Sequence, residues 1–284
     1  MSIAIKRVLV IANRAKEPAE RITEEICREL QQRGVTVEVF AFCGKPVDPE
    51  IDHYDLAISL GGDGTVLYAS RLVCRHQIPI LPVNLGDFGF ITEVAQNEWL
   101  QAFERYCSGK IEAGRRLLIH VEVERDADSI ASFVGLNDVV VSAAGISKIV
   151  KLNVELAESS LGGYRADGMI VATPTGSTAY SAAAGGPILH PEMEAMILNP
   201  ICPFTLSHRP IVLPPNEVVR IHVEQNQRTS VMMTVDGQSE LTLEPGDVIT
   251  VRRAAHSAFI IRSDRRSFYE VLRSKLNWSG GPDA

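Results

Sequence analysis

The most constraining feature of the chain is a Gly-Gly-Asp-Gly-Thr pentapeptide at residues 61–65. An apolar run at 54–60 precedes it and an apolar-periodic stretch at 66–73 follows, which predicts a strand, a tight turn and a helix. Glycine permits positive φ and close approach of a ligand, and a helix N-terminus offers N–H groups and a positive dipole end to an anion. The pattern therefore predicts a phosphate-binding loop made by Gly61, Gly62, Gly64 and Thr65.

One carboxylate, that of Asp63, lies inside this loop. A carboxylate beside phosphates is electrostatically unfavourable unless it handles a proton or faces a metal ion. Asp63 is therefore the candidate catalytic base. The alternative is that Gly-Asp-Gly forms an ordinary tight turn, because short glycine motifs also recur by accident.

A second polar segment follows an expected strand at 169–172. Four hydroxyl residues and a glycine occupy 173–178, ahead of the small residues at 179–184. Hydroxyl side chains can cap a helix, but one cap needs one hydroxyl, so the surplus favours a surface that hydrogen-bonds a polar ligand. The small residues at 182–186 fit close approach of that ligand or tight helix packing equally well.

These segments together resemble the NAD kinase family. The resemblance spans about Val8 to Trp278 and is carried by GGDGT at 61–65, NLGDFGF at 84–90, Asn137-Asp138, the run at 167–187 that contains TPTGSTAY, and DGQ at 236–238. GGDGT alone is shared with diacylglycerol, sphingosine and phosphofructokinase-type kinases, so it indicates only a superfamily. TPTGSTAY is far more specific.

The resemblance implies transfer of the γ-phosphoryl group of ATP to the 2′-hydroxyl of the adenosine ribose of NAD, which yields NADP. Mg²⁺ or another divalent cation would travel with ATP, because no cluster of carboxylates is visible and no protein metal ligand is assigned. The NAD-binding residues implied are Asp63, Gly64, Asn137, Asp138, Lys148, Arg165, Asp167, Thr178, Ala179, Tyr180, Ser181, Ala182, Ala183 and Gln238.

Within that set, Asn137 is expected to pair with adenine through its amide, and Asp138 to accept hydrogen bonds from ribose hydroxyls. Asp167 would meet the positively charged nicotinamide end. In the family this carboxylate can come from a neighbouring subunit, which implies a homodimer or homotetramer. Lys148 falls where relatives often have arginine. A phosphate contact there would be made by a single ammonium group rather than by a guanidinium that donates two hydrogen bonds. Arg165 differs between branches of the family.

The Asp236-Gly237 pair lies between two alternating runs, where Asp-Gly is the strongest hairpin signal. We therefore expect this turn to be structural and only Gln238 to reach ligand. Asn137-Asp138 differs because it interrupts a strand-like run at 133–142 with two adjacent polar residues. An exposed sheet edge would also explain that pair.

Alternation of strand and helix patterns predicts an α/β domain at 1–114, with a parallel sheet covered by helices. Its expected strands lie at 7–13, 35–42, 56–60 and 78–84, and its expected helices at 19–32 and from a cap at Asn97 to about 106. Period-two runs after Gly114 predict an all-β domain at 115–264 that binds NAD and oligomerises. The last segment, 265–284, contains an expected helix at 269–276 and is expected to return to the first domain, as in the family.

Composition excludes several partners. The net charge of −7 without a basic cluster disfavours nucleic acid, and no stretch is apolar and long enough for a bilayer. The first apolar run is expected to be a strand rather than a signal peptide. Five scattered cysteines indicate reduced thiols and a cytoplasmic location. Seven histidines lack the spacing of a zinc site.

Two alternative functions stay open at this point. A lipid or sugar kinase of the same superfamily would share GGDGT but would not need the TPTGSTAY pocket. A non-catalytic sensor of NAD or NADP would keep the pocket but should have lost its base, whereas Asp63 is present.

Overall fold

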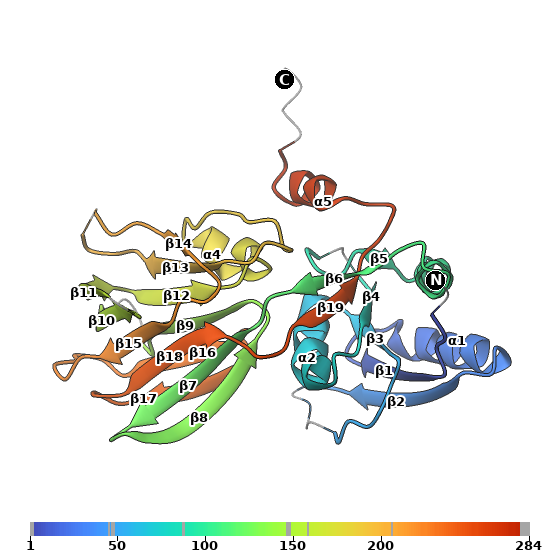
Figure 1. Cartoon of the computed structure of the whole chain (residues 1–284), viewed down its shortest axis with the longest axis horizontal. Helices are drawn as coiled ribbons and strands as arrows, with labels where there is room; N and C mark the ends of the chain where they lie inside the picture. The colour runs from blue at the N-terminus through green and yellow to red at the C-terminus, as the bar shows by residue number, and fades with distance from the viewer. Residues whose placement is uncertain are drawn as a thin grey trace. The chain divides into compact units, whose positions relative to one another are not determined.

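The chain folds into two compact units, Met1–Arg115 with Ala258–Ala284 and Arg116–Ser257 (Figure 1). The computed structural model describes residues 3–44, 46, 49–86, 89–145, 149–157, 159–205 and 207–278. The first unit holds one sheet with helices, and the second unit holds two sheets. The first unit combines strands and helices as predicted, and the second unit is built mainly of strands but also contains the short helix α4 (Tyr180–Ala183).

The sheet of the first unit has the order β2-β1-β3-β4-β19-β6, with β5 paired to β4. The pairs β1–β2, β1–β3, β3–β4, β4–β5 and β4–β19 are all parallel. The strands are β1 (Arg7–Asn13), β2 (Thr36–Phe42), β3 (Leu56–Gly61), β4 (Ile80–Asn84), β5 (Val94–Ala95), β6 (Ala113–Arg116) and β19 (Ala258–Ile261).

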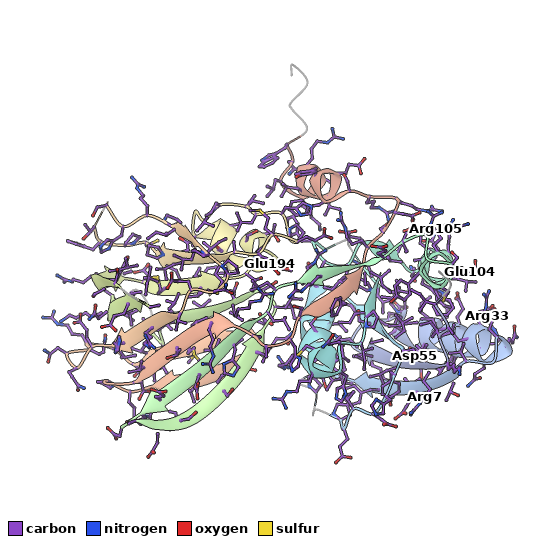
Figure 2. The ribbon with its side chains drawn as sticks, viewed as in Figure 1. Arg7, Arg33, Asp55, Glu104, Arg105 and Glu194 are labelled. Carbon is purple, nitrogen blue, oxygen red and sulfur yellow. The ribbon has the colours of Figure 1, made fainter. Side chains whose placement is uncertain are left out.

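Helices cover both faces of this sheet. Alternate residues of β1 belong to different cores: Val10 packs with residues of α1 (Ala19–Gln32) and α3 (Trp99–Cys107), and Ile11 with residues of α2 (Asp63–Val73). Side chains alternate across a strand, so α1 and α3 lie on one face and α2 on the other. An ion pair of 2.8 Å between Arg33 and Glu104 joins the ends of α1 and α3 (Figure 2).

Most predicted elements of this unit are confirmed, and α1 has the predicted bounds. Two details differ. The cap of α3 is Glu98 rather than Asn97, and the Glu98 carboxylate accepts the N–H of Ala95 at 3.1 Å. Strand β19 falls in the stretch assigned to the β domain, but it pairs with β4 and so belongs to the first unit.

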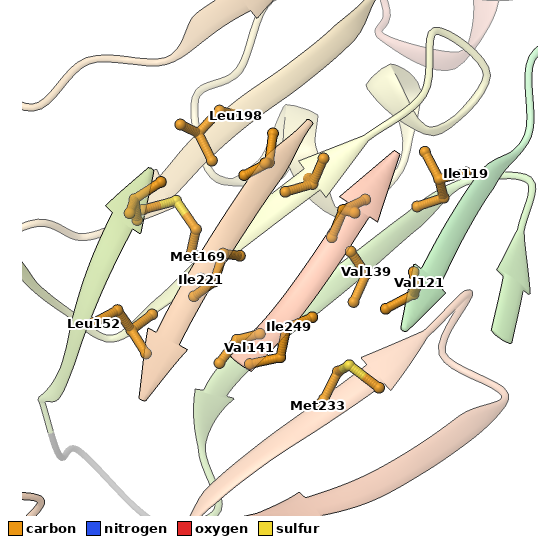
Figure 3. Close-up of a cluster of buried hydrophobic side chains, with 14 of the residues drawn as sticks. Ile119, Val121, Val139, Val141, Leu152, Met169, Leu198, Ile221, Met233 and Ile249 are labelled. Carbon is orange, nitrogen blue, oxygen red and sulfur yellow. The ribbon is translucent and has the colours of Figure 1, made fainter. Parts of the chain in front are cut away.

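The second unit packs two six-stranded sheets face to face, with the orders β11-β10-β15-β18-β7-β8 and β14-β13-β12-β9-β16-β17. Ile249 and Val121 from the first sheet share a core with Val141 and Met233 from the second (Figure 3). The strands are β7 (Ile119–Arg125), β8 (Asp128–Gly135), β9 (Asp138–Ala143), β10 (Val150–Leu156), β11 (Ser159–Ala166), β12 (Gly168–Ala172), β13 (Met196–Ile201), β14 (Ile211–Leu213), β15 (Val219–Val223), β16 (Val231–Val235), β17 (Ser239–Leu243) and β18 (Val248–Arg253).

The strand-like run predicted at 133–142 is two strands rather than one. Strand β8 ends at Gly135 in one sheet, and β9 begins at Asp138 in the other. Residues 136 and 137 therefore form the connection by which the chain changes sheets. The polar pair Asn137-Asp138 interrupts the run because strand pairing stops where the chain leaves one sheet for the other. Asp138 does not lie on an exposed edge strand, since β9 lies between β12 and β16.

The last described helix, α5 (Phe268–Lys275), belongs to the first unit. Its N-cap Ser267 and Glu270 form a reciprocal capping box. Just before it, Arg266 donates to the carboxylate of Glu98 at 2.8 Å, which ties this segment to the start of α3. None of the helices in the described ranges is long and apolar enough to cross a membrane.

Candidate active site

The predicted strand–turn–helix at 61–65 is present. Strand β3 ends at Gly61, Gly62 is the N-cap in an extended conformation with φ −112°, and Asp63 is the first residue of α2. None of the glycines in this loop has positive φ. Gly61 is needed for a different reason, because a Cβ there would collide with the Thr65 side chain. Around Gly62 the space is open, as a loop that receives a ligand requires.

The Asp63 carboxylate is held by the segment that follows β4. Its Oδ2 accepts the backbone N–H of Phe90 at 2.8 Å. Its Oδ1 accepts three donors, namely the N–H groups of Ile91 at 3.1 Å and Thr92 at 2.9 Å and the Thr92 hydroxyl at 2.9 Å. A carboxylate oxygen has two lone pairs. Oδ2 therefore keeps capacity for one further donor, whereas Oδ1 is saturated.

Thr92 completes this network. Its hydroxyl, which donates to Asp63, also accepts from the Asn84 amide at 2.8 Å and from the Gly89 N–H at 3.1 Å. A Cβ at Gly89 would collide with the Asp63 carboxylate, so glycine is required for the approach of this segment. Both loops follow strands of the predicted parallel sheet, and in the structure hydrogen bonds from residues 90–92 to Asp63 join them. Asp87 and Phe88, inside the second loop, lie outside the described residues.

A cavity of about 570 Å³ lies beside the end of β4 in the first unit. Sequence reasoning missed this cavity, because its wall combines segments distant in the chain. Its lining is mostly polar and consists of Arg21, Ile22, Glu25, Asn84, Gly86, Ala95, Gln96 and Asn97. The volume is in the range of small-ligand sites.

In the second unit, Asn137 and Asp138 lie at the change of sheet. The Asn137 carbonyl accepts the N–H of Thr173 at 2.8 Å, and the Thr173 hydroxyl donates to the Leu136 carbonyl. A Cβ at Gly176 would overlap the Asn137 backbone. The structure thus brings the predicted polar pair together with the start of the 173–178 segment. Within the described ranges, the buried Oδ1 of Asn137 has no hydrogen-bond partner.

The Asp138 side chain is buried. Burial, and next the negative charge of Asp236, raises the pKa of Asp138 to about 7. Asp236 was predicted to be a turn residue only. The turn is confirmed, with φ of 53° at Asp236 and 61° at Gly237 between β16 and β17. However, the Asp236 carboxylate also accepts three backbone N–H groups, those of residues 136–138.

The surplus of hydroxyls at 173–178 is explained mostly by internal hydrogen bonds, contrary to prediction. Ser177 donates to the Pro174 carbonyl at 2.6 Å and accepts the Leu189 N–H at 2.9 Å, and Thr178 donates to the Thr175 carbonyl at 3.2 Å. No side chain caps the short helix α4 (Tyr180–Ala183). Among the described residues, the buried Thr175 hydroxyl lacks a partner.

The residues at 178–183, which belong to the implied NAD-binding set, differ in exposure. Thr178, Ala179, Tyr180, Ala182 and Ala183 reach the surface, and Tyr180 is 48% exposed. Ser181 is fully buried, and the Asn199 amide donates to its carbonyl at 3.0 Å. A Cβ at Gly186 would collide with Ser181 and Asn199. At Gly186 the small side chain therefore serves tight packing.

The remaining candidates lie on the same unit with exposed or half-buried side chains. Arg165 and Asp167 are exposed, and the Arg165 guanidinium lies 5.5 Å from the centre of the Phe204 ring. Gln238 closes the Asp236 turn, and its N–H donates to the Val235 carbonyl at 3.0 Å. Lys148 lies outside the described residues. In the part of the chain that is described, no group of three or more His, Cys, Asp and Glu side chains could hold a metal ion.

Comparison with known proteins agrees with this geometry. The family model for the ATP-NAD kinase N-terminal domain matches residues 45–111, and that for the ATP-NAD kinase C-terminal domain matches residues 136–263. The NAD kinase of Treponema denticola is 40% identical over 277 residues, which cover 97% of this chain and 98% of that protein. The chain belongs to the ATP-NAD kinase family.

Solved structures support the assignment. The yeast NADH kinase in complex with NADH matches with a TM-score of 0.86 and 25% identity, covering 98% of this chain and 89% of that one. An NAD kinase from Archaeoglobus fulgidus in complex with ATP matches with a TM-score of 0.75 and 25% identity, covering 97% of this chain and 100% of that one. The NAD kinase family, rather than the lipid and sugar kinases that share GGDGT, is thus the one to which the whole chain belongs.

Proposed function

We propose that this NAD kinase family member transfers the γ-phosphoryl group of ATP to the 2′-hydroxyl of the adenosine ribose of NAD, so that NADP forms. ATP-dependent NAD kinase activity comes with the family. The observation that carries the atomic assignment is the Asp63 carboxylate, which starts α2 after a glycine loop and keeps one lone pair of Oδ2 uncommitted.

Asp63 acts as the proton acceptor. The ribose hydroxyl donates to Oδ2 and loses its proton there as its oxygen attacks the γ-phosphorus. Phosphoryl transfer depends mainly on positioning and on charge stabilisation. The hydrogen bonds from residues 90–92 supply the positioning, because they fix the carboxylate plane before substrate binds.

Donor phosphates bind at Gly62 and Gly64 at the N-terminus of α2, where the space around Gly62 is open, while Gly61 and Thr65 shape the loop. Mg²⁺ or another divalent cation arrives bound to ATP, where it neutralises phosphate charge. No step assigned to the protein's own residues depends on it.

The second unit binds the adenosine half of NAD. Asn137 presents an unpartnered amide oxygen to the adenine amino group, and Asp138 accepts from ribose hydroxyls. Thr178 to Ala183 form the pocket wall, with Tyr180 as the flat exposed surface, and Gln238 lies at its margin. Asp167 faces the nicotinamide end beside Arg165. The homodimer or homotetramer and the cytoplasmic location stay predictions, and neither nucleic acid nor a membrane is a proposed partner.

The experiment is an assay of NADP formation from NAD and Mg-ATP with purified protein. Asp63→Asn should lower kcat by roughly 10²–10⁴-fold, the usual contribution of a general base, while NAD binding persists. Asp55→Asn is the matched control. Asp55 also accepts two backbone N–H groups, from Lys6 at 2.7 Å and Arg7 at 2.9 Å, but at the amino ends of β1 and β3 (Figure 2).

If Asp55→Asn lowered activity as much as Asp63→Asn, the loss would be structural and Asp63 would not be the base. A wild-type protein that binds NAD without forming NADP would instead be the non-catalytic sensor.

A further inference from the structure

The turn at Asp236 is joined to the connection between β8 and β9. Asp236 Oδ2 accepts the N–H of Leu136 at 2.8 Å, and its Oδ1 accepts those of Asn137 at 2.7 Å and Asp138 at 3.2 Å. The Asp236 N–H donates in return to the Asp138 carbonyl at 2.9 Å. Asp236 as a whole residue is only 7% exposed, so these bonds form away from water. We call this set of contacts the Asp236 clamp.

The clamp is needed because the chain changes sheets at this point. Leu136 and Asn137 lie between the two ladders, so no neighbouring strand accepts their N–H groups. A buried donor without a partner is strongly unfavourable. The carbonyls of the same two residues are taken by Thr173. The main chain of the connection is therefore fixed from two sides, and the Asn137 and Asp138 side chains project from a fixed backbone.

Two glycines make room for this arrangement. A Cβ at Gly135 would lie 3.1 Å from Asp236 Oδ1 and 2.9 Å from the Val235 side chain. A Cβ at Gly176 would overlap the Asn137 backbone from the opposite side. The positive φ of Asp236 is also part of the arrangement. Asp and Asn tolerate this conformation better than other residues with a side chain, since a short polar side chain can hydrogen-bond locally.

We infer that Asp236 is a positioning residue for NAD: it sets the place of the Asn137 amide and the Asp138 carboxylate through the main chain, and thereby determines NAD affinity. This inference rests on the proposed function of Asn137 and Asp138. It assigns to Asp236 a role that a hairpin turn does not require. The β7–β8 hairpin supplies the comparison, because Asp126 there has φ of 51° with its side chain exposed.

Asp236 also acts on Asp138 by charge. Burial is the first cause of the raised pKa of Asp138, and the Asp236 charge is the second. The strands that flank β9 contribute no other ionisable group, because β12 reads GMIVA and β16 reads VMMTV. The facing segment at 173–176 is likewise uncharged. Removal of the Asp236 charge should therefore lower the pKa of Asp138 without a change at Asp138 itself.

The test compares Asp236→Asn and Asp236→Gly with Asp126→Asn and Asp126→Gly. Asn keeps one acceptor oxygen and tolerates positive φ, and Gly removes the side chain without backbone strain. We expect NAD to bind about 10- to 100-fold more weakly to the Asp236 variants in calorimetry, since hydrogen bonds to a charged group are lost. The KM for NAD should rise while the KM for ATP stays constant. The Asp126 variants should behave as the native protein.

The pH profile separates positioning from general loss of structure. In Asp236→Asn the midpoint of the pH dependence of NAD affinity should move to lower pH, because the neighbouring negative charge is gone. A merely loosened fold would not move that midpoint. Thr173→Val, with Thr173→Ser as its control, loosens the same connection from the other side and should raise the KM for NAD even if the Asp236 variants do not fold.

Unchanged NAD affinity in folded Asp236→Gly, or in Thr173→Val if neither Asp236 variant folds, would overturn the inference. This result differs from the one expected if the proposed function itself were wrong. If the proposed function were wrong, the native protein would neither bind nor phosphorylate NAD.

Discussion

Thr92 donates two hydrogen bonds to a single oxygen of Asp63, one from its backbone N–H and one from its hydroxyl, each at 2.9 Å. The same hydroxyl accepts from Asn84 and Gly89. Thr92 is fully buried, so water does not replace these bonds when they are lost. The position of the proposed base thus depends on Thr92, a residue that lies outside the sequence motifs at 61–65 and 84–90.

Thr92→Val should therefore impair the enzyme although valine has nearly the same shape. The Gly89 N–H would lose its acceptor, and the Asn84 amide would keep only the Thr92 carbonyl at 3.3 Å, which costs about 1–3 kcal/mol of unfolding free energy. The Asp63 carboxylate would also lose one of its fixed donors, so kcat should fall. Chemical denaturation and the NADP assay check this. Thr92→Ser retains the hydroxyl and should keep kcat near the native value; equal losses in both variants would contradict the argument.

Gly89→Ala tests the approach of the two loops. The new methyl group would overlap the Asp63 carboxylate, and overpacking of this kind costs about 1–3 kcal/mol. Gly86→Ala is the control for thermal stability, because the methyl group that it adds would enter open space. We expect the Tm to fall for Gly89→Ala and to stay nearly constant for Gly86→Ala. A similar Tm in both variants would show that the segment moves away from Asp63 at little cost.

A buried ion pair in the second unit provides a stability test. Arg125 contacts both oxygens of Asp247 at 2.8 Å, and Asp247 is fully buried. Burial raises the pKa of Asp247, but the Arg125 and Glu244 hydrogen bonds lower it by more, and the net pKa is lowered. Arg125→Met would leave a buried charge unpaired and should cost about 3–5 kcal/mol.

The control is Arg33→Met, which breaks the exposed pair with Glu104 and should cost less than about 1 kcal/mol. Because the pKa of Asp247 is lowered on folding, its contribution is present above the unfolded pKa and is lost as pH falls through the folded pKa. The difference in unfolding free energy between the native protein and Arg125→Met, measured by urea denaturation, should thus become smaller at acidic pH. If this difference did not change with pH, the Arg125–Asp247 ion pair would not be its cause.

The sequence predicted the elements whose pattern is local. Helix α1 has the predicted bounds because the apolar periodicity of residues 19–32 specifies it locally. Gly61 was predicted as part of a phosphate-binding loop, and Gly89 only as part of the motif at 84–90. Their actual role is close contact with Thr65 and Asp63, which depends on tertiary packing.

The carboxylate of Asp236 shows the same limit more clearly. As an Asp-Gly turn it was predicted correctly, but its three N–H donors lie 98 to 100 residues earlier in the chain. No local pattern records a hydrogen bond over that separation. For the same reason the surplus of hydroxyls at 173–178 favoured a ligand-binding surface, although the partners of the Thr173 and Ser177 hydroxyls are backbone groups inside the fold.

The raised pKa of Asp138 predicts a specific dependence of stability on pH. An exposed aspartate in the unfolded chain titrates at about 3.9, whereas burial and the charge of Asp236 raise the pKa in the folded chain to about 7. Between these values the folded chain holds a proton that the unfolded chain has released. Stability therefore falls as pH rises through this window. At ~1.4 kcal/mol for each pKa unit, the effect is on the order of a few kcal/mol.

Asp138→Asn removes this titration while it keeps the shape of the side chain. The unfolding free energy of Asp138→Asn minus that of the native protein should therefore increase from about pH 4 to pH 7 and be constant above. NAD affinity should follow the opposite trend in the native protein, because the ionised Asp138 carboxylate accepts from two ribose hydroxyls. The NAD affinity of the native protein should therefore rise with pH through about pH 7, whereas that of Asp138→Asn should not change with pH. Parallel stability curves for the two proteins would show that Asp138 titrates normally, and the Asp236 charge would then have no part in NAD binding.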